Sequence, residues 1–534
     1  MKENVTLEIV ITNNKWIEEK HMPEWLSKAI FYEIYPQSFQ DTNADGIGDF
    51  EGIIRRLDYI KELGCNSIWI NPCFASPFMD AGYDVADYYK AAPRYGTNDD
   101  LKRLFEEVHK RNMHILLDLV PGHTSNQHDW FTESKKADKN EYTDRYIWTN
   151  TVWENPESLL CIRGISDRDG SCGINFFSSQ PALNYGYANP TKDYQMSPLD
   201  KAPMETREAM KDIMRFWLTL GCDGFRVDMA GNLIKNDDSD ATANIKLWQD
   251  FMGYIKKEFP DAAMVSEWGE PKKSIAGGFH MDFLLHFGMD CYTSLFRAEE
   301  PFFSKRGKGN IGTFVKEYSD MYNLSKGKGL ICIPSGNHDM ERLALGKDMD
   351  ELKICFAFLL SMPGAPFIYY GDEIGMKYLT GLTSVEGGYS RTGSRSPMQW
   401  NSGVNAGFST ACPDDLYIRM DEDKERPTVE MQLMDENSLL HVIMKLTALR
   451  EKYPAIQNNG EFEFVYANEN EYPLVYLRRC DNEEILIAIN PSAKEESCEI
   501  KKVATEIIGS VGVSAMIKDG KLTIPACSAT FFRV

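Results

Sequence analysis

The sequence alternates between short apolar runs and amphipathic segments over most of its length, and this alternation constrains the fold more than any other feature. Eight apolar runs are predicted strands, at residues 29–36, 67–72, 114–120, 224–228, 263–267, 281–287, 330–334 and 366–370. The main predicted helices cover residues 50–64, 99–112, 205–220, 244–259, 312–323, 351–362 and 437–452. Strands that alternate with helices of this size form a parallel sheet with the helices outside. The predicted fold class is therefore α/β, a (β/α)8 TIM barrel.

Two stretches break the alternation and divide the 534 residues into domains. Residues 125–202 are rich in Asn, Asp, Ser, Gly and aromatic residues, and a long irregular insertion of this kind is usually functional. It follows the third strand and is the predicted domain B. Beyond residue 456 the pattern changes to short alternating strands, which predicts an all-β C-terminal domain over 456–534. The barrel is then expected to span 23–124 and 203–455, after an N-terminal extension of residues 1–22.

The composition narrows the choice of partners. The chain has 58 Lys and Arg against 80 Asp and Glu, a net charge of −22, which disfavours nucleic acid and anionic membrane surfaces. No run of about 20 apolar residues is present, and the first 16 residues make a poor signal peptide. The 12 cysteines contain no closely spaced CxxC pair and fit reduced, buried thiols. These features predict a cytoplasmic protein without a membrane partner; the oligomeric state stays open.

Charged side chains stand at the ends of several predicted strands. They are Asp118 and His123 after the third strand, Arg226 and Asp228 at the fourth, Glu267 at the fifth, and His338 and Asp339 after the seventh. Taken singly, each has a plain alternative, such as a loop cap, a core histidine or a surface turn. Taken together, they are expected to meet at the rim formed by the carboxyl ends of the strands. Two carboxylates there can cleave a glycosidic bond, one as nucleophile and the other as acid.

A second polar cluster lies in the loop after the first strand. Acidic or amide oxygens recur at alternate positions, with glycine where the chain must turn sharply, and this pattern suits Ca²⁺ or Mg²⁺. The predicted ligands are Asp41, Asn43, Asp45, Ile47 and Asp49. The loop lacks the bidentate Glu of an EF-hand, so that motif is excluded. The alternative is a polar turn held by side-chain hydrogen bonds.

Five motifs resemble the signatures of the α-amylase superfamily of glycoside hydrolases, family 13, and the resemblance extends from about residue 23 to the C-terminus. They are Asp118–His123, Gly224–Asp228, Glu267, Asn337–Asp339 and, inside the insertion, Gln180–Asn184. The resemblance implies that Asp228 is the nucleophile, Glu267 the general acid and base, and Asp339 the stabiliser of the transition state. It also implies that Arg226, His123 and His338 bind the sugar at the cleavage site.

Within that superfamily the sequence looks most like the group of oligo-1,6-glucosidases, α-glucosidases and trehalose synthases. The metal-type loop, the Gly82–Val85 motif and the segment Ser390–Trp400 carry this likeness. In such enzymes an aspartate and an arginine hold the non-reducing glucose and close the pocket behind it. The likeness implies Asp84 and Arg391 for that pair, with Tyr83 as a platform under the sugar. Outside a pocket, such an ion pair would contribute little.

Three positions depart from the family pattern. Gly122 replaces an Asn of the first signature and Ala182 an Asp of the insertion signature, which weakens the case for the calcium site of true α-amylases. Met229, directly after the expected nucleophile, matches neither the α-1,6 nor the α-1,4 pattern, so linkage preference stays open.

The expected function is a retaining, exo-acting α-glucosidase on short α-glucosides. The alternative is a glucosyl-transferring or isomerising enzyme of the trehalose synthase or sucrose-active type. A non-catalytic relative of the transporter heavy-chain type would need a transmembrane helix and would lack the carboxylates. The expected substrate is a small oligosaccharide or disaccharide, with a structural Ca²⁺ or Mg²⁺ and no organic cofactor.

Overall fold

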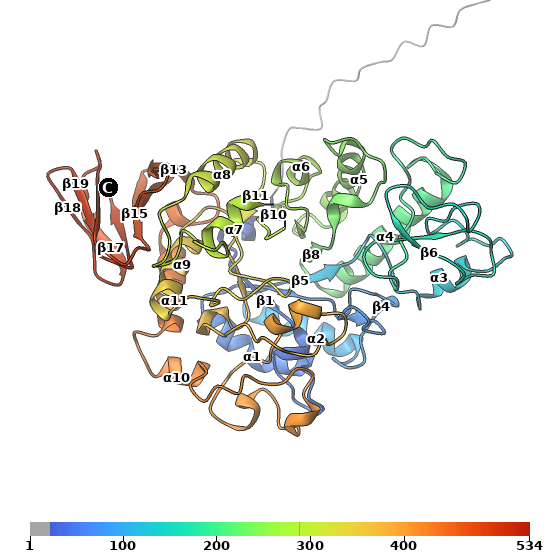
Figure 1. Ribbon diagram of the computed structural model, residues 1–534, viewed down its shortest axis with the longest axis horizontal. Coiled ribbons are helices and arrows are strands. Elements are labelled where there is room, and N and C mark those ends of the chain that lie inside the picture. Colours follow the sequence, from blue (N-terminus) through green and yellow to red (C-terminus); the bar gives the residue numbers. More distant parts are fainter. Residues whose placement is uncertain (1–21, 288) are drawn as a thin grey trace, which may run out of the picture.

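The centre of the molecule is a parallel sheet of eight strands, seen in the computed structural model, which describes residues 22–287 and 289–534. The predicted N-terminal extension lies outside these ranges, apart from residue 22. The strands are β1 (Phe31–Ile34), β2 (Ser67–Ile70), β5 (His114–Leu119), β8 (Gly224–Val227), β9 (Ala263–Ser266), β10 (Met281–Phe283), β11 (Leu330–Cys332) and β12 (Phe367–Tyr369). Their order is β11-β10-β9-β8-β5-β2-β1-β12, and a parallel bridge between Pro334 and Phe367 joins the two outer strands. The predicted (β/α)8 barrel is confirmed (Figure 1).

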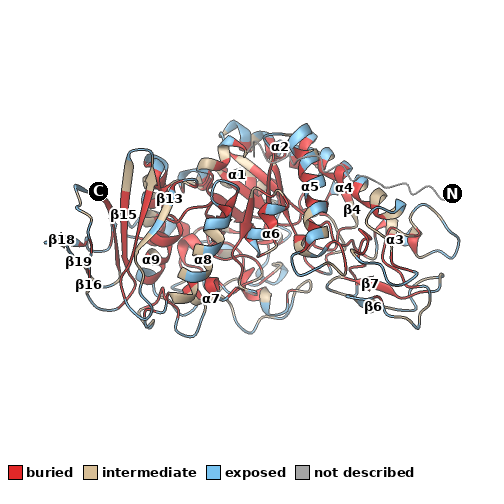
Figure 2. Ribbon diagram, turned by 90° about the horizontal axis from the view of Figure 1, so that it is seen from above, coloured by how far each residue is buried: buried red, intermediate tan, exposed pale blue. Residues whose placement is uncertain are grey.

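Helices cover the outside of this barrel. They are α1 (Phe50–Glu62), α2 (Asn98–Lys110), α4 (Lys201–Leu220), α5 (Thr242–Glu258), α6 (Pro271–Ala276), α7 (Asp290–Phe296), α8 (Gly312–Ser325), α9 (Met349–Leu359), α10 (Val429–Leu433) and α11 (Leu439–Lys452). Their inward faces are buried and their outward faces exposed, as Figure 2 shows for α2, α4 and α5. Side chains fix where several begin: Asp49 caps α1, and Thr97 forms a capping box with Asp100 at α2.

The sixth strand is shorter than the sequence predicts. The prediction extends to residue 287, but β10 ends at Phe283. The chain then leaves the barrel wall, and His286 and Phe287 line a pocket at the rim. The apolar pattern of the sequence therefore continues beyond the strand, although the hydrogen-bonded pairing of the sheet ends at Phe283.

The insertion between β5 and α4 holds little regular structure: the helix α3 (Asp129–Ser134) and a hairpin of β6 (Leu160–Ile162) and β7 (Cys172–Ile174). A second two-stranded sheet, β3 (Phe74–Ala75) and β4 (Asp87–Ala91), lies in the chain before it. The insertion and the C-terminal sheets lie at opposite ends of the molecule (Figure 1).

The C-terminal part is all β, as predicted. One sheet has the order β13-β14-β15-β20-β17 and the other β16-β19-β18, and every pairing in both is antiparallel. The strands are β13 (Glu461–Tyr466), β14 (Leu474–Cys480), β15 (Glu483–Asn490), β16 (Glu496–Glu499), β17 (Glu506–Val511), β18 (Met516–Lys518), β19 (Lys521–Ile524) and β20 (Ser528–Arg533). In the described part of the chain, no helix combines the length and apolar character needed to cross a membrane, and all twelve cysteines are free thiols.

Candidate active site

A pocket of about 240 Å³ lies at the carboxyl ends of the barrel strands. Its lining consists of Asp80, Tyr83, His123, Phe176, Gln180, Asp228, Met229, Glu267, His286, Phe287, Asp339 and Arg391. A larger hollow of about 560 Å³ in the C-terminal sheets is lined mainly by residues 500–507 and 515–520. That hollow contains none of the paired buried carboxylates found here, so the rim pocket is the better candidate for chemistry.

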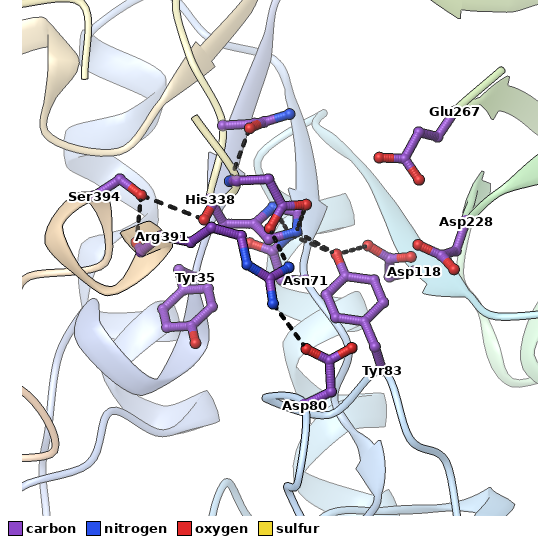
Figure 3. Close-up of polar contacts among 12 residues, drawn as sticks. Tyr35, Asn71, Asp80, Tyr83, Asp118, Asp228, Glu267, His338, Arg391 and Ser394 are labelled. Atoms are coloured by element: carbon purple, nitrogen blue, oxygen red, sulfur yellow. Dashed lines mark hydrogen bonds and ion pairs between the residues drawn. The ribbon is translucent and has the colours of Figure 1, made fainter. Parts of the chain in front are cut away.

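The strand β8 places a buried guanidinium among carboxylates. Arg226 is 1% exposed, and its Nη1 donates to Asp118 Oδ1 at 2.9 Å and to Asp228 Oδ1 at 3.1 Å. Its Nη2 lies 2.7 Å from Glu267 Oε1. A charge buried this deeply is tolerated only when it is paired and hydrogen-bonded, and here one cation faces three carboxyl groups. The predicted residues Arg226, Asp228 and Glu267 therefore form one cluster, and Figure 3 shows Asp228 and Glu267 close to Asp118.

Close contact between strands makes this arrangement possible. Gly224, which begins β8, has φ 141°, and a Cβ at this position would come within 1.8 Å of the carbonyl oxygen of Ala263 on β9. Only glycine fits that approach without moving the backbone. The close contact keeps the strands bearing Asp228 and Glu267 side by side.

Burial raises the pKa values of Asp228 and Glu267 toward neutral pH. It raises the pKa of Asp228 to about 6, with Arg226 opposing and Asp118 adding to the rise. It raises the pKa of Glu267 to about 7, because Asp228 and Asp339 add to the effect of burial while Arg226 opposes it. The pair thus separates into a stronger acid and a weaker acid, which is the difference needed between a nucleophile and a proton donor.

Met229 forms a sharp turn directly after Asp228. Its backbone is left-handed, with φ 44° and ψ 42°, which is rare for a side chain of this size. Its N–H donates to Glu267 Oε2 at 3.1 Å, and its side chain lines the pocket. The turn therefore links the backbone after Asp228 directly to the carboxylate of Glu267.

Asp339 receives three donors on the opposite side of the pocket. Its Oδ1 accepts from Arg391 Nη1 and Arg395 Nη2, each at 2.9 Å, and its Oδ2 lies 3.0 Å from His338 Nε2. Burial alone would raise the pKa of Asp339, but His338, Arg395 and Arg391 outweigh it and hold the pKa well below its usual range. Burial lowers the pKa of His338, yet Asp339 and Glu33 together raise it to about 9. Asp339 is therefore an anion and His338 a cation at neutral pH.

Tyr83 and His338 form a flat surface beside the carboxylates. Their rings stack with centroids 5.3 Å apart and an angle of 14° between the planes. The Tyr83 hydroxyl donates to Asp118 Oδ2 at 3.0 Å and lies 2.7 Å from His338 Nε2. Tyr83 lines the pocket, and Figure 3 shows its hydroxyl directed toward Asp118; its role as a platform under a sugar ring stays a prediction.

His123 reaches the pocket from the first signature. Its Nε2 lies 3.0 Å from the carbonyl oxygen of Tyr83, and Asn175 Nδ2 donates to its Nδ1 over 3.4 Å. Burial lowers the pKa of His123 to about 4, so the ring is neutral at pH 7. The buried Nζ of Lys235 donates to Asn175 Oδ1 at 3.3 Å, which connects this amine to His123 through one amide; burial lowers the pKa of Lys235 to about 7.

The expected pair of Asp84 and Arg391 is wrong. Asp84 is fully buried and accepts hydrogen bonds from the Ser76 hydroxyl at 2.9 Å and from the N–H groups of Met79 and Asp80 at 2.9 and 3.1 Å. Its carboxylate therefore holds its own loop together. Arg391 instead pairs with Asp80, whose Oδ1 lies 3.2 Å from Arg391 Nη2 (Figure 3).

Several residues of the site were not singled out from the sequence. They are Asp80, Gln180, Phe176, Phe287, His286, Arg395, Asn71 and Glu33. Glu33 carried a visible signal, because it is a charged residue inside the apolar first strand, and it lies 2.9 Å from His338 Nδ1. Gln180 was quoted as part of a motif but without a role, and its Nε2 donates to Asp80 Oδ2 at 2.8 Å. The aromatic residues lie in irregular segments and carried no signal.

The loop of predicted metal ligands is held by hydrogen bonds to its own backbone. Asp41 Oδ1 accepts from the N–H groups of Asn43 and Ala44, and Asp45 Oδ1 accepts from that of Ile47, all at 2.9 Å. Asp49 Oδ1 accepts from Gly52 N–H at 2.7 Å. Among residues 22–287 and 289–534, no group of three or more His, Cys, Asp or Glu side chains is placed to hold a metal ion. The donor chemistry suits a hard cation, whereas the side chains are turned toward the backbone, so the metal stays a prediction.

Comparison with known proteins gives the family. Residues 33–459 match the family model described as the catalytic domain of alpha amylase. The chain is 31% identical over 520 residues to the trehalose synthase/amylase TreS of Mycobacterium tuberculosis (strain ATCC 25618 / H37Rv), covering 88% of this chain and 82% of that one. It is 30% identical over 576 residues to a probable alpha-glucosidase of Rhizobium meliloti (strain 1021), covering 96% and 97%.

Among solved structures, the trehalulose synthase MutB from Pseudomonas mesoacidophila MX-45 shares the fold, with a TM-score of 0.78 at 23% identity over 95% of this chain and 99% of that one. The matched family model covers most of the barrel and the insertion, including the strand ends that carry the carboxylates. The chain belongs to the alpha-amylase family, whose members act on glycosidic bonds, and residues 33–459 form its alpha-amylase catalytic domain.

Proposed function

We propose that the protein is a retaining, exo-acting α-glucosidase that hydrolyses short α-glucosides. The observation that carries this proposal is the contact of one buried guanidinium, that of Arg226, with Asp228 at 3.1 Å and with Glu267 at 2.7 Å on neighbouring strands. Two carboxyl groups held this near each other, with different pKa values, suit a double displacement.

In the proposed mechanism Asp228 attacks the anomeric carbon as Glu267 gives its proton to the departing glycosidic oxygen. A covalent glucosyl ester on Asp228 results, and the leaving sugar departs as an alcohol. Glu267, now ionised, takes a proton from water, and the resulting attack releases α-glucose and regenerates Asp228. Asp339, an anion beside the pocket, would stabilise the positive charge that develops on the sugar ring.

The contacts of Arg391 support exo-action on short substrates. Arg391 bridges Asp80 and Asp339 and also donates to the carbonyl oxygen of Gly387 at 2.7 Å, so the loop that carries it is held against the pocket. A pocket closed in this way admits one terminal glucose and excludes the middle of a long chain.

Glucosyl transfer or isomerisation is the second candidate function. Met229 and the half-exposed Phe176 and Phe287 line the pocket, and an apolar lining favours a sugar acceptor over water. A relative of 31% identity is also named a trehalose synthase. Both functions use the same glucosyl ester and differ only in its acceptor.

We also propose that the loop of Asp41, Asn43, Asp45, Ile47 and Asp49 binds Ca²⁺ or Mg²⁺. Three carboxylates, one amide and the main-chain carbonyl of Ile47 within nine residues support this. Calorimetric titration with each ion should show binding to the wild type that Asp45→Asn weakens; unchanged binding in the variant would contradict the site. A cytoplasmic location is likewise proposed, supported by twelve free thiols.

A product profile on maltose, isomaltose, sucrose and trehalose tests the function. Hydrolysis predicts that at least one of these substrates yields free glucose and that no new glucose-containing disaccharide or trisaccharide forms. The transfer alternative predicts a new disaccharide or trisaccharide in excess of free glucose. No turnover of any of the four by the wild type would contradict both.

A further inference from the structure

Asp282 is a fully buried carboxyl group that does not line the pocket. It lies on β10, next to β9, and pairs in the ladder with Ser266, the last residue of β9. Its Oδ1 accepts from the Ser266 hydroxyl at 2.7 Å and from the N–H groups of Trp268 at 3.2 Å and Gly269 at 3.4 Å. In the described part of the chain, its Oδ2 has no hydrogen-bond partner.

These donors flank Glu267. Ser266 precedes it and Trp268 follows it, so one carboxyl oxygen holds the side chain of the residue before Glu267 and the backbone of the residue after it. The Ser266 hydroxyl also lies 2.5 Å from that of Ser274, inside α6. The connection therefore runs from β10 through the end of β9 to the next helix.

Packing alone does not account for a carboxyl group in this place. Burying one is costly, and an apolar residue of similar size would fill the space between the strands. An apolar side chain would, however, leave the buried N–H groups of Trp268 and Gly269 without this acceptor. Three donors converge on one oxygen of Asp282. This indicates that its carboxyl group maintains the conformation of the chain around Glu267.

We propose that Asp282 is a positioning residue, which aims the carboxyl group of Glu267 at the leaving oxygen by fixing residues 266, 268 and 269. This inference rests on the proposed function, because it gives Glu267 the role of proton donor. Proton transfer requires the donor within about 2.6–3.2 Å of its acceptor, so a small change in backbone direction is enough to impair it.

Positioning and simple stability make different predictions for different leaving groups. A methyl α-glucoside needs a proton on its leaving oxygen, whereas fluoride departs from α-glucosyl fluoride with little help from an acid. The ratio of kcat/KM for the two substrates therefore reports proton donation in the first chemical step. A partly unfolded enzyme loses kcat/KM for both substrates equally.

The experiment measures kcat/KM on both substrates for wild type, Asp282→Ala and Asp282→Asn. We expect Asp282→Ala to lose about 100-fold on the methyl glucoside, the lower range of a general-acid contribution, and less than about 5-fold on the fluoride. Asp282→Asn retains an oxygen acceptor and should lose less. Ser266→Ala removes one donor and should shift the ratio in the same direction, which covers the case in which Asp282→Ala does not fold.

Glu373→Gln is the matched control, since it changes another fully buried carboxyl group, located after β12. It should leave the ratio between the substrates unchanged. Equal losses on both substrates in every Asp282 and Ser266 variant, or no loss, would overturn the inference while the proposed function stands. A wild type inactive on both substrates would overturn the proposed function and this inference with it.

Discussion

At the bottom of the pocket, Arg226 contacts Asp118, Asp228 and Glu267, and this arrangement explains why two chemically similar carboxyl groups take different roles. Arg226 opposes the rise in pKa that burial causes in all three. The charge of Asp228 adds to the rise in the pKa of Glu267, to about 7, whereas a hydrogen bond with Glu267 lowers the pKa of Asp228, which is about 6. Of Asp228 and Glu267, Asp228 is the group that ionises first as pH rises.

The pH dependence of kcat/KM follows from these values. Activity on maltose should fall below pH about 6, where Asp228 is protonated, and above pH about 7, where Glu267 loses its proton. With α-glucosyl fluoride the fall at high pH should be much smaller, because that substrate needs little protonation. Activity on maltose that keeps rising beyond pH 8 would contradict the assignment of Glu267.

Asp80 and Asp84 lie in the same loop, and we expect Asp80 to contribute to substrate binding and Asp84 to the stability of the fold. Asp80→Ala removes the partner of Arg391 at the closed end of the pocket and should lower kcat/KM on maltose by about 100-fold, with little change in Tm. Asp84→Ala leaves the N–H groups of Met79 and Asp80 without an acceptor and should lower Tm by several degrees. Kinetics and thermal unfolding of the two variants check this; the opposite pattern would restore Asp84 as the partner.

The error at Asp84 shows a limit of sequence reasoning at the residue scale. The motif indicated that an acid of this loop meets Arg391, but two acids lie four residues apart. Which of them points into the pocket depends on the left-handed backbone of Phe78 and Ala81, with φ 59° and 50°. Neither residue type favours that conformation, so the sequence did not indicate the turn.

At the scale of elements, hydrophobic periodicity predicted all eight barrel strands and the long helices. The short helices α6 and α7, of six and seven residues, were not predicted. They are too short to show a clear helical period. The end of β10 was missed for the opposite reason, since an apolar pattern continued where the ladder had stopped.

One buried carboxyl group between elements gives a stability prediction. Glu373 follows β12, and the hydroxyls of Tyr32 on β1 and Tyr59 on α1 both donate to its Oε1 at 2.7 Å. Burial raises the pKa of Glu373 from 4.5 to about 7, although both tyrosines oppose the shift. The folded state binds the proton of Glu373 more tightly than the unfolded state does. The resulting stabilisation of the folded state is fully present below pH about 4.5 and is lost as pH rises through about 7.

Glu373→Gln keeps an acceptor for both tyrosines and removes the titration. Between pH 4.5 and 7 its free energy of unfolding should fall by about 3 kcal/mol less than that of the wild type. Chemical denaturation of both proteins across this range measures the difference. Parallel curves for the two proteins would show that Glu373 does not titrate with this shift.

At the scale of the whole molecule, the pocket is assembled from segments far apart in the chain. The barrel supplies the carboxylates, the insertion supplies Phe176 and Gln180, and the loop after β12 supplies Arg391. The sequence predicted the barrel residues because strand ends share a rim. The insertion and the late loop lack periodicity: Arg391 was expected at the pocket from the family resemblance, whereas Phe176 and the contact of Gln180 with Asp80 are seen only in the tertiary structure.

Two buried arginines hold the chain between α9 and β12, one from the barrel helix α11 (Arg450) and one from β14 of the C-terminal sheets (Arg478). Arg450 donates to the carbonyl oxygens of Leu360, Met362 and Gly364, and Arg478 donates to those of Ser361 and Gln457. These contacts hold the segment that leads into the amino end of β12, and Arg478 thereby connects the C-terminal sheets to the barrel. The C-terminal strands contribute no residue to the lining of the pocket, and they lie at the end of the molecule opposite the insertion (Figure 1).

The stereochemistry of the first product tests the central claim most directly. Proton NMR of glucose released from an aryl α-glucoside, recorded before mutarotation, reports the anomer formed at the enzyme. A covalent ester on Asp228, formed and broken by two inversions, predicts α-glucose first, with the β-anomer appearing only as mutarotation proceeds. Initial release of β-glucose would contradict the two-carboxylate retaining mechanism.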